Sequence, residues 1–349
     1  MPIRDWMVKE SDLDDDQLNV MQAILDKSCI VSGCAGSGKS VLALIKAQRI
    51  QKEKGKNYQI IVYTKALCEY MNSGRETLGL SNNFYYHWQW KNRLDMPSAD
   101  YTIVDEIQDF TEEEISEFID ATKKHFFFFG DTAQSIYKDF KDTVPVEDIL
   151  YRFKQARTTT KTFQLFRNYR LPLPVAKIAQ FIGEDLPPFI DSIYKNKEKQ
   201  LPYILQYNNE NEQIDAIVTI IKKRSLADVG IFMPDNKSVE ELVGRFHDND
   251  IDVEYRYSKD GSSVDTLNFE TDLPKIMTYH SAKGLQFETV FIPLLPAVID
   301  KEKRSALYVA MTRTYHYLYM MYSSFLPDLL EDVPEEDYLI TTEDNIDDL

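Results

Sequence analysis

Residues 33–40, GCAGSGKS, place glycines, a lysine and a serine directly after the apolar run CIV. Gly33, Gly36 and Gly38 allow a tight turn that brings backbone N–H groups close to a ligand. The following stretch, VLALIKAQRI, is typical of a helix, so a bound anion would also meet the positive end of a helix dipole. Lys39 could then reach the β- and γ-phosphates of a nucleotide, and Ser40 could ligate Mg²⁺. The alternative is a tight turn before a buried helix, which leaves the lysine unexplained.

Two further segments place polar residues at the ends of apolar runs. In YTIVDEIQDF (101–110), Asp105 and Glu106 would face the same crevice as the phosphate loop if YTIV is a parallel strand. Asp105 is predicted to hold Mg²⁺, and Glu106 to orient or deprotonate an attacking water. In FGDTAQSIY (129–137), Gln134 is predicted to sense a γ-phosphate. An acidic loop and an ordinary strand–turn–helix are the structural alternatives.

Apolar runs that alternate with helical patterns predict an α/β fold with parallel sheets. The first series has strands at 28–31, 59–63, 101–104 and 125–129, and helices at 39–54, 65–78 and 112–123. Four consecutive phenylalanines in the last strand favour a strand that is covered on both faces. A second series begins near Thr162 with the strand candidates TFQLF, LPYILQY, VGIFMP, KIMTY, TVFIP and YLYMMY. We therefore expect domains at 1–160 and 161–326, followed by an acidic tail at 327–349.

The composition is compatible with two ordinary domains, since 43% of the 349 residues are hydrophobic. The net charge is −17, but ten acidic residues and no basic ones lie between Asp328 and the end of the chain. The remainder can still hold a local basic groove, so the charge neither supports nor excludes a nucleic-acid partner. Three cysteines without metal-type spacing, no signal-peptide core and no apolar run of ~18 residues predict a cytoplasmic protein without a membrane partner.

The ordered segments GCAGSGKS, VDEIQD and GDTAQSIY resemble the motifs of superfamily 1 helicases of the UvrD/Rep type. The resemblance implies two tandem RecA-like P-loop NTPase domains that bind ATP and Mg²⁺ between them. In QLNVMQAI, Gln22 stands at the position of the adenine-reading glutamine. YTKALCEYM (63–71), which contains Thr64, resembles a segment that contacts a nucleic-acid single strand. YYHW (85–88), which contains His87, resembles the family's T-F-H-S segment.

Three segments of the second half continue the resemblance. In FRNYRLP (166–172), Tyr169 matches a tyrosine that packs on adenine, and Arg170 matches an arginine that reaches the γ-phosphate. LYVAMTRTYHYLYM (307–320) places Arg313 as an arginine finger. TYHSAKGLQFETVFIP (278–293) is similar to a stretch that contacts the nucleic-acid backbone and ends in an acid at the nucleotide sugar. The implied residues are Thr278, His280 and Lys283 for nucleic acid and Glu288 for the sugar.

The resemblance implies an ATP-dependent translocase or helicase that acts on single-stranded nucleic acid, with DNA favoured over RNA. The chain departs from the family in its length, because only about 40 residues separate Lys65 from Asp105 and leave no room for an inserted subdomain. Duplex unwinding therefore does not follow from the motifs. An ATPase subunit that works through a protein partner is the second interpretation. A P-loop kinase of a small molecule would lack a second sheet domain.

Two features of the sequence leave alternatives open. Asp139 stands where the family commonly has a base-stacking tryptophan, and Phe140, Trp88 or Trp90 could either replace it or pack in a core. The acidic tail could occupy a basic groove as an internal mimic of nucleic acid, it could dock on a partner, or it could be solvated and partly disordered.

Overall fold

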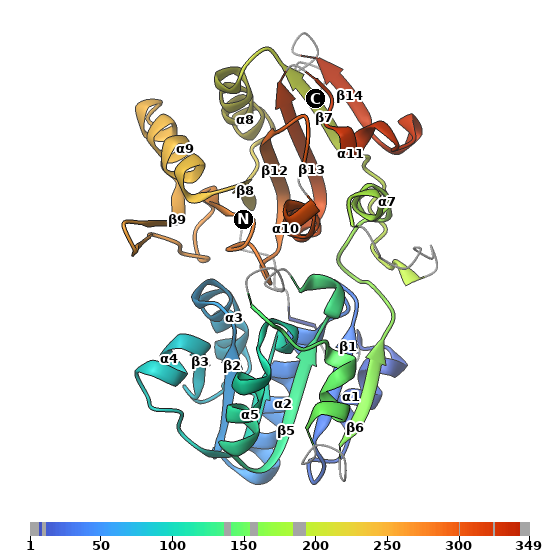
Figure 1. Ribbon diagram of the computed structural model, residues 1–349, viewed down its shortest axis with the longest axis vertical. Helices are drawn as coiled ribbons and strands as arrows, with labels where there is room; N and C mark the ends of the chain where they lie inside the picture. Colours follow the sequence, from blue (N-terminus) through green and yellow to red (C-terminus); the bar gives the residue numbers. More distant parts are fainter. Residues whose placement is uncertain are drawn as a thin grey trace. The chain divides into compact units, whose positions relative to one another are not determined.

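A computed structural model of the protein describes residues 7–8, 12–135, 141–153, 160–183, 193–299, 301–323 and 325–342. The chain divides into two compact units, the first ending at Tyr169 and the second beginning at Arg170. Each unit has an α/β fold (Figure 1). The division lies later than the predicted residue 160 because TFQLF, which we assigned to the second domain, is a strand of the first sheet.

The sheet of the first unit has six strands in the order β3-β2-β4-β5-β1-β6, and all neighbouring pairs are parallel. A parallel sheet needs a crossover between its strands, and these crossovers supply the helices that cover it. The strands are β1 (Cys29–Gly33), β2 (Tyr58–Val62), β3 (Phe84–Tyr86), β4 (Ala99–Val104), β5 (Thr122–Gly130) and β6 (Lys161–Leu165).

The phenylalanines of β5 confirm that this strand is covered on both faces. Phe127 and Phe129 pack in one core cluster with α1–α3, while Phe126 and Phe128 pack in another with α4–α6. This alternation follows from the two-residue period of a strand. The helices are α1 (Asp15–Gln22), α2 (Lys39–Lys54), α3 (Lys65–Thr77), α4 (His87–Asn92), α5 (Glu112–Asp120) and α6 (Ile149–Arg152).

Helix starts in the first unit follow local capping chemistry. Thr111 and Glu114 form a capping box at the acidic start of α5, and the Thr64 hydroxyl accepts the N–H of Leu67 at 3.1 Å at the start of α3. Gly38 precedes α2 with a left-handed φ of 88°. The phosphate loop therefore leads directly into the first turn of α2.

The sheet of the second unit has eight strands in the order β10-β9-β11-β8-β12-β13-β7-β14. All neighbours are parallel except the hairpin of β9 and β10. Asp260 and Gly261 both have positive φ in its turn, a combination that an Asp-Gly pair favours and that we did not use in the sequence. The strands are β7 (Tyr203–Tyr207), β8 (Val229–Met233), β9 (Glu254–Lys259), β10 (Ser262–Asp265), β11 (Lys275–Thr278), β12 (Phe287–Leu295), β13 (Thr314–Ser323) and β14 (Leu339–Thr342).

Helices of the second unit pack in two groups. One core cluster joins α8 (Glu210–Arg224) and α9 (Asn236–Asp248) to the sheet. Outside that cluster, α7 (Leu173–Ile182) packs with α10 (Lys301–Met311) and with α11 (Asp328–Glu331) (Figure 1). Among the described residues, no helix combines the length and the apolar character that crossing a bilayer requires.

The prediction of a separate acidic tail is wrong for residues 327–342. β14 pairs in parallel with β7, and Lys177 donates to Asp337 at 2.7 Å. Leu330 and Tyr338 are buried. Apolar residues spaced between the acidic ones thus attach this segment to the sheet edge. Residues 343–349 lie outside the described residues.

Candidate active site

The phosphate loop, residues 33–40, connects β1 to α2. Gly36 and Gly38 have left-handed φ values of 72° and 88°, which other residues rarely adopt. The Lys39 ammonium is buried and donates to the carbonyls of Gly33 at 2.8 Å and Cys34 at 3.0 Å. It also lies 3.8 Å from Asp131 Oδ2. A phosphate oxygen in the loop would meet a cation that is already held in place by its own chain.

The structure places Gln17, rather than Gln22, beside this loop. Gln22 ends α1 and is exposed, whereas Gln17 is buried and its Nε2 donates to Ser37 O at 2.9 Å. Gln17 also forms a capping box with Asp14. Each glutamine lies four residues after a leucine, so the pattern Leu-x-x-x-Gln fits both positions. Only the packing of α1 distinguishes them.

Asp105 directly follows the last residue of β4 and is fully buried. Its Oδ1 accepts the Glu106 N–H at 3.0 Å, while Oδ2 is buried and accepts no hydrogen bond from the described part of the chain. Burial, together with the neighbouring Glu106 carboxylate, raises the pKa of Asp105, and a hydrogen bond from Ser40 opposes the shift. A carboxylate oxygen and a hydroxyl oxygen are hard ligands of the kind that Mg²⁺ prefers. The residues predicted to hold Mg²⁺ therefore fit that ion.

Glu106 begins a polar network that joins the ends of β4 and β5. It adopts a left-handed conformation with φ 58°, so the chain turns sharply after β4. The Gln108 amide donates to Glu106 Oε2 and accepts the Asp131 N–H at 2.9 Å. Gln134 Nε2 in turn donates to Asp131 Oδ2 at 2.5 Å. The network brings the predicted Glu106 and Gln134 into one cluster with Lys39.

Two members of this network, Gln108 and Asp131, were missed in the sequence. Both lie inside segments that we had already selected, VDEIQD and GDTAQSIY, but their side chains meet only because β4 and β5 are neighbours. Gly130 leaves the room that the contact needs. A Cβ at Gly130 would lie 2.6 Å from Gln108 Oε1.

Tyr169 is anchored on the phosphate loop within the first unit. Its N–H donates to Gly36 O at 2.9 Å, and its hydroxyl donates to Asp14. Burial and the bond to Asp14 raise the pKa of the phenol. Tyr169 is 38% exposed. Arg170 follows directly but belongs to the second unit.

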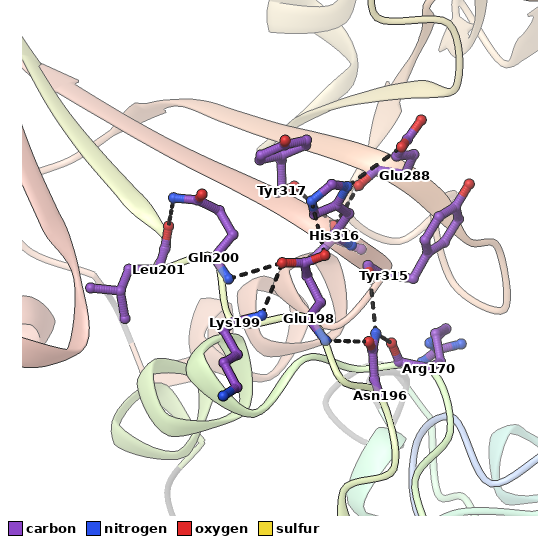
Figure 2. Close-up of polar contacts among 11 residues, drawn as sticks. Arg170, Asn196, Glu198, Lys199, Gln200, Leu201, Glu288, Tyr315, His316 and Tyr317 are labelled. Atoms are coloured by element: carbon purple, nitrogen blue, oxygen red, sulfur yellow. Dashed lines mark hydrogen bonds and ion pairs between the residues drawn. The ribbon is translucent and has the colours of Figure 1, made fainter. Parts of the chain in front are cut away.

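Glu288 and Arg313 occupy neighbouring strand and helix ends of the second unit. The Glu288 N–H donates to Asp228 Oδ2 at 3.0 Å, and the carboxylate points toward His316 (Figure 2). Arg313 is 1% exposed, and its Nε donates to Val309 O at 2.8 Å in the last turn of α10. The guanidinium thus donates to one carbonyl at the end of α10 and to the Thr312 hydroxyl, and its role toward phosphate stays a prediction.

The residues predicted to contact nucleic acid have separate structural roles. Thr278 accepts the Ser281 N–H at 3.2 Å, much as Thr64 caps α3. The His87 ring packs against Phe110 with ring centroids 5.1 Å apart, and burial lowers the pKa of His87, so the imidazole is neutral at pH 7. His280 is half-buried and Lys283 is buried.

The two described tryptophans that we considered for base stacking differ. Trp90 is fully buried and donates to Gln59 Oε1 at 2.9 Å, so it belongs to the core. Trp88 is 51% exposed and stacks on Tyr86. Asp139 and Phe140 lie outside the described residues.

The sequence matches two models of helicase families. Residues 29–224, more than half of the chain, match the family model of the viral superfamily 1 RNA helicase core domain. The chain belongs to this family of superfamily 1 helicase cores. Residues 275–321 match the UvrD-like helicase C-terminal domain. The predicted resemblance is confirmed, and the two α/β units of this superfamily 1 protein are RecA-like domains.

Other comparisons add little. No curated protein matches the sequence. Among solved structures, the C-terminal domain of a possible DNA helicase from Lactobacillus plantarum WCFS1 aligns with a TM-score of 0.38 and 18% identity. The alignment covers 49% of this chain and 98% of that one. A similarity of this size carries no argument about function.

Proposed function

We propose that the protein is an ATP-dependent translocase or helicase that hydrolyses ATP at the phosphate loop and acts on single-stranded nucleic acid, DNA rather than RNA. The observation that carries the proposal is the network around Asp131. It brings Lys39, Glu106 and Gln134 together at the carboxyl ends of β1, β4 and β5. Ligands of open parallel sheets bind at this edge.

Each residue of the first unit has a role in the proposed reaction. Lys39 neutralises the β- and γ-phosphates, and Ser40 and Asp105 hold Mg²⁺, which supplies charge neutralisation when bound. Glu106 orients the attacking water and accepts its proton. Gln134 responds to the γ-phosphate through Asp131. Gln17 replaces Gln22 as our candidate for the base-reading glutamine, because it alone of the two lies beside the loop.

Tyr169 of the first unit stacks on the base. The second unit supplies the groups that complete the proposed cycle: Glu288 accepts from a sugar hydroxyl, and Arg170 and Arg313 meet the γ-phosphate. A ligand that binds one arrangement of the two units better than another shifts the population toward that arrangement. ATP would thus favour closure and hydrolysis would release it. Nucleic-acid contacts from Thr64, His87, Thr278, His280 and Lys283 would convert this cycle into steps along a strand.

The test is the ATPase rate with and without single-stranded DNA or RNA. We expect strong stimulation by a single strand and a decline of the apparent affinity with salt, whose slope counts the phosphate contacts. Lys39→Ala should abolish turnover. ATP turnover in purified Lys39→Ala that equals the wild-type rate would overturn the assignment of hydrolysis to the phosphate loop.

A second candidate function is a nucleotide-controlled ATPase that works through a protein partner without unwinding. The short connection between Lys65 and Asp105 favours it, because it leaves no room for an inserted subdomain and duplex unwinding does not follow from the motifs. An ATPase that no single strand stimulates would support this candidate over the motor.

A further inference from the structure

Three side chains that we did not predict as site residues connect the backbone of Arg170 to the carboxylate of Glu288 (Figure 2). They are Asn196, Glu198 and His316, and we call them the brace. We propose that the brace positions Arg170 and Glu288 for the nucleotide before it binds. This inference rests on the proposed function, in which Glu288 meets the sugar and Arg170 meets the γ-phosphate.

Asn196 ties the chain at Arg170 to the sheet of the second unit. Its Nδ2 donates to Arg170 O and to Tyr315 O, the latter at 2.9 Å, and Tyr315 lies on β13. Its Oδ1 accepts the Glu198 N–H at 2.9 Å. Both ends of the amide are therefore engaged, which holds the side chain in one rotamer. The backbone from which the Arg170 guanidinium extends is fixed to a central strand.

His316 lies between two carboxylates. Its Nε2 is 3.1 Å from Glu198 Oε2, and its Nδ1 is 3.5 Å from Glu288 Oε1. Each ring nitrogen of His316 therefore lies within hydrogen-bonding reach of a different carboxylate, so the ring links Glu198 to Glu288.

Glu198 is itself held by its own segment. Its Oε1 accepts the N–H groups of Lys199 at 2.9 Å and Gln200 at 3.1 Å. The Glu198 carboxylate, which contacts His316, therefore cannot change its rotamer without breaking two hydrogen bonds to backbone N–H groups. These bonds fix the position of Glu198 within the brace.

The brace acts on a side chain whose backbone is already fixed. The Glu288 N–H donates to Asp228, and the Glu288 carbonyl accepts from the Thr314 hydroxyl at 3.0 Å. The side chain is 40% exposed, and a glutamate loses much rotamer freedom when it is ordered. Ordering by His316 before binding reduces that loss, which raises affinity. A carboxylate accepts at both oxygens, so Glu288 can hold His316 through Oε1 and a sugar hydroxyl through Oε2.

The two halves of the brace predict different kinetic effects. Loss of the His316 contact should weaken sugar recognition, a ground-state interaction, and so raise KM. Loss of Asn196 should let the Arg170 backbone move, which weakens an interaction with the reacting phosphoryl group and lowers kcat. A residue needed only for folding would lower the amount of active protein without this division.

The sugar half is tested by calorimetric titration with ADP, 2′-deoxyADP and 3′-deoxyADP. We expect wild type to bind ADP about tenfold more tightly than at least one deoxy analogue, as for a hydrogen bond to a charged acceptor. His316→Phe keeps an aromatic ring but removes both ring nitrogens, and it should reduce this discrimination to about twofold or less. The control Gln200→Ala removes a side chain of the same segment that donates to Leu201 O, and it should behave as wild type. If His316→Phe fails to fold, Glu198→Gln should lose part of the discrimination because it removes one charge.

The arginine half is tested by steady-state kinetics of Asn196→Ala, for which we expect kcat to fall about tenfold with ADP affinity within about twofold of wild type. An unchanged kcat would overturn this half. If wild type and His316→Phe prefer ADP over the deoxy analogues by the same factor, the sugar half is overturned and the proposed function stays intact. A wild-type protein that binds no adenine nucleotide would overturn both. The wild-type protein could also bind ADP more tightly than a deoxy analogue, lose this preference in His316→Phe, and yet not hydrolyse ATP. That result would support the brace and overturn the proposed hydrolysis.

Discussion

Gln108 provides the sharpest test of the proposed chemistry, because it is fully buried and bridges the two carboxylate-bearing strand ends. Gln108→Leu keeps most of the volume but removes both side-chain hydrogen bonds. The Asp131 N–H is then a buried donor without its acceptor, at a cost of about 1–3 kcal/mol. Glu106 loses a hydrogen bond to a charged group, which is worth about 1.5–3 kcal/mol. Together we expect a loss of about 3–5 kcal/mol in the free energy of unfolding.

The effect on turnover separates function from stability. Without Gln108, the Glu106 carboxylate loses a hydrogen bond that fixes its direction toward the water, and removal of a positioned general base costs about 10²–10⁴ in rate. We expect kcat to fall by about 10² because Glu106 itself remains. KM for ATP should change by less than about threefold, since Lys39 and the phosphate loop are untouched.

The matched control is Gln59→Leu. Gln59 is another buried glutamine of the same sheet that bridges two groups, Thr102 Oγ1 at 3.1 Å and Trp90 Nε1 at 2.9 Å. Its loss should lower stability by a similar amount and leave kcat per folded molecule unchanged. The assays are denaturant unfolding and steady-state ATP hydrolysis below the unfolding transition of each variant. If folded Gln108→Leu keeps kcat within twofold of wild type, the reasoning about Glu106 is refuted.

Three further predictions concern α1, a buried lysine and the C-terminal segment. Gln17→Leu should weaken ATP binding about tenfold, whereas Gln22→Ala should not; equal effects in a binding titration would contradict our choice of Gln17. Burial lowers the pKa of Lys46 to about 8 from 10.5, so between these values the unfolded chain binds more protons than the native one. The free energy of unfolding should then rise with pH by at most about 1.4 kcal/mol per unit. Lys46→Met should show a smaller slope in denaturation at pH 8 and pH 10, and an identical slope would refute this. Truncation after Ser323 should lower Tm by several degrees, because it exposes β7 and the core around Leu330. An unchanged melting curve would mean that β14 does not contribute to the stability of the fold.

The sequence alone determined the features that depend on neighbouring residues. The phosphate loop could be recognised because its glycines, lysine and serine are contiguous and its conformation requires glycine at Gly36 and Gly38. Ten of the strands followed from short apolar runs, whereas β3, β9, β10 and β14 were not predicted. The fold class and the first set of site residues, Lys39, Asp105 and Glu106, came from these local signals.

Only the tertiary structure decided which distant residues meet. The Leu-x-x-x-Gln pattern fits both Gln17 and Gln22, and the packing of α1 on the loop selects one. Gln108 and Asp131 interact because β4 and β5 are neighbours in the sheet, which no local spacing encodes. Acidic composition suggested a solvated tail, but a free edge of β7 and a few apolar side chains outweigh that charge. Local sequence sets conformation, whereas strand order sets the contacts that make a site.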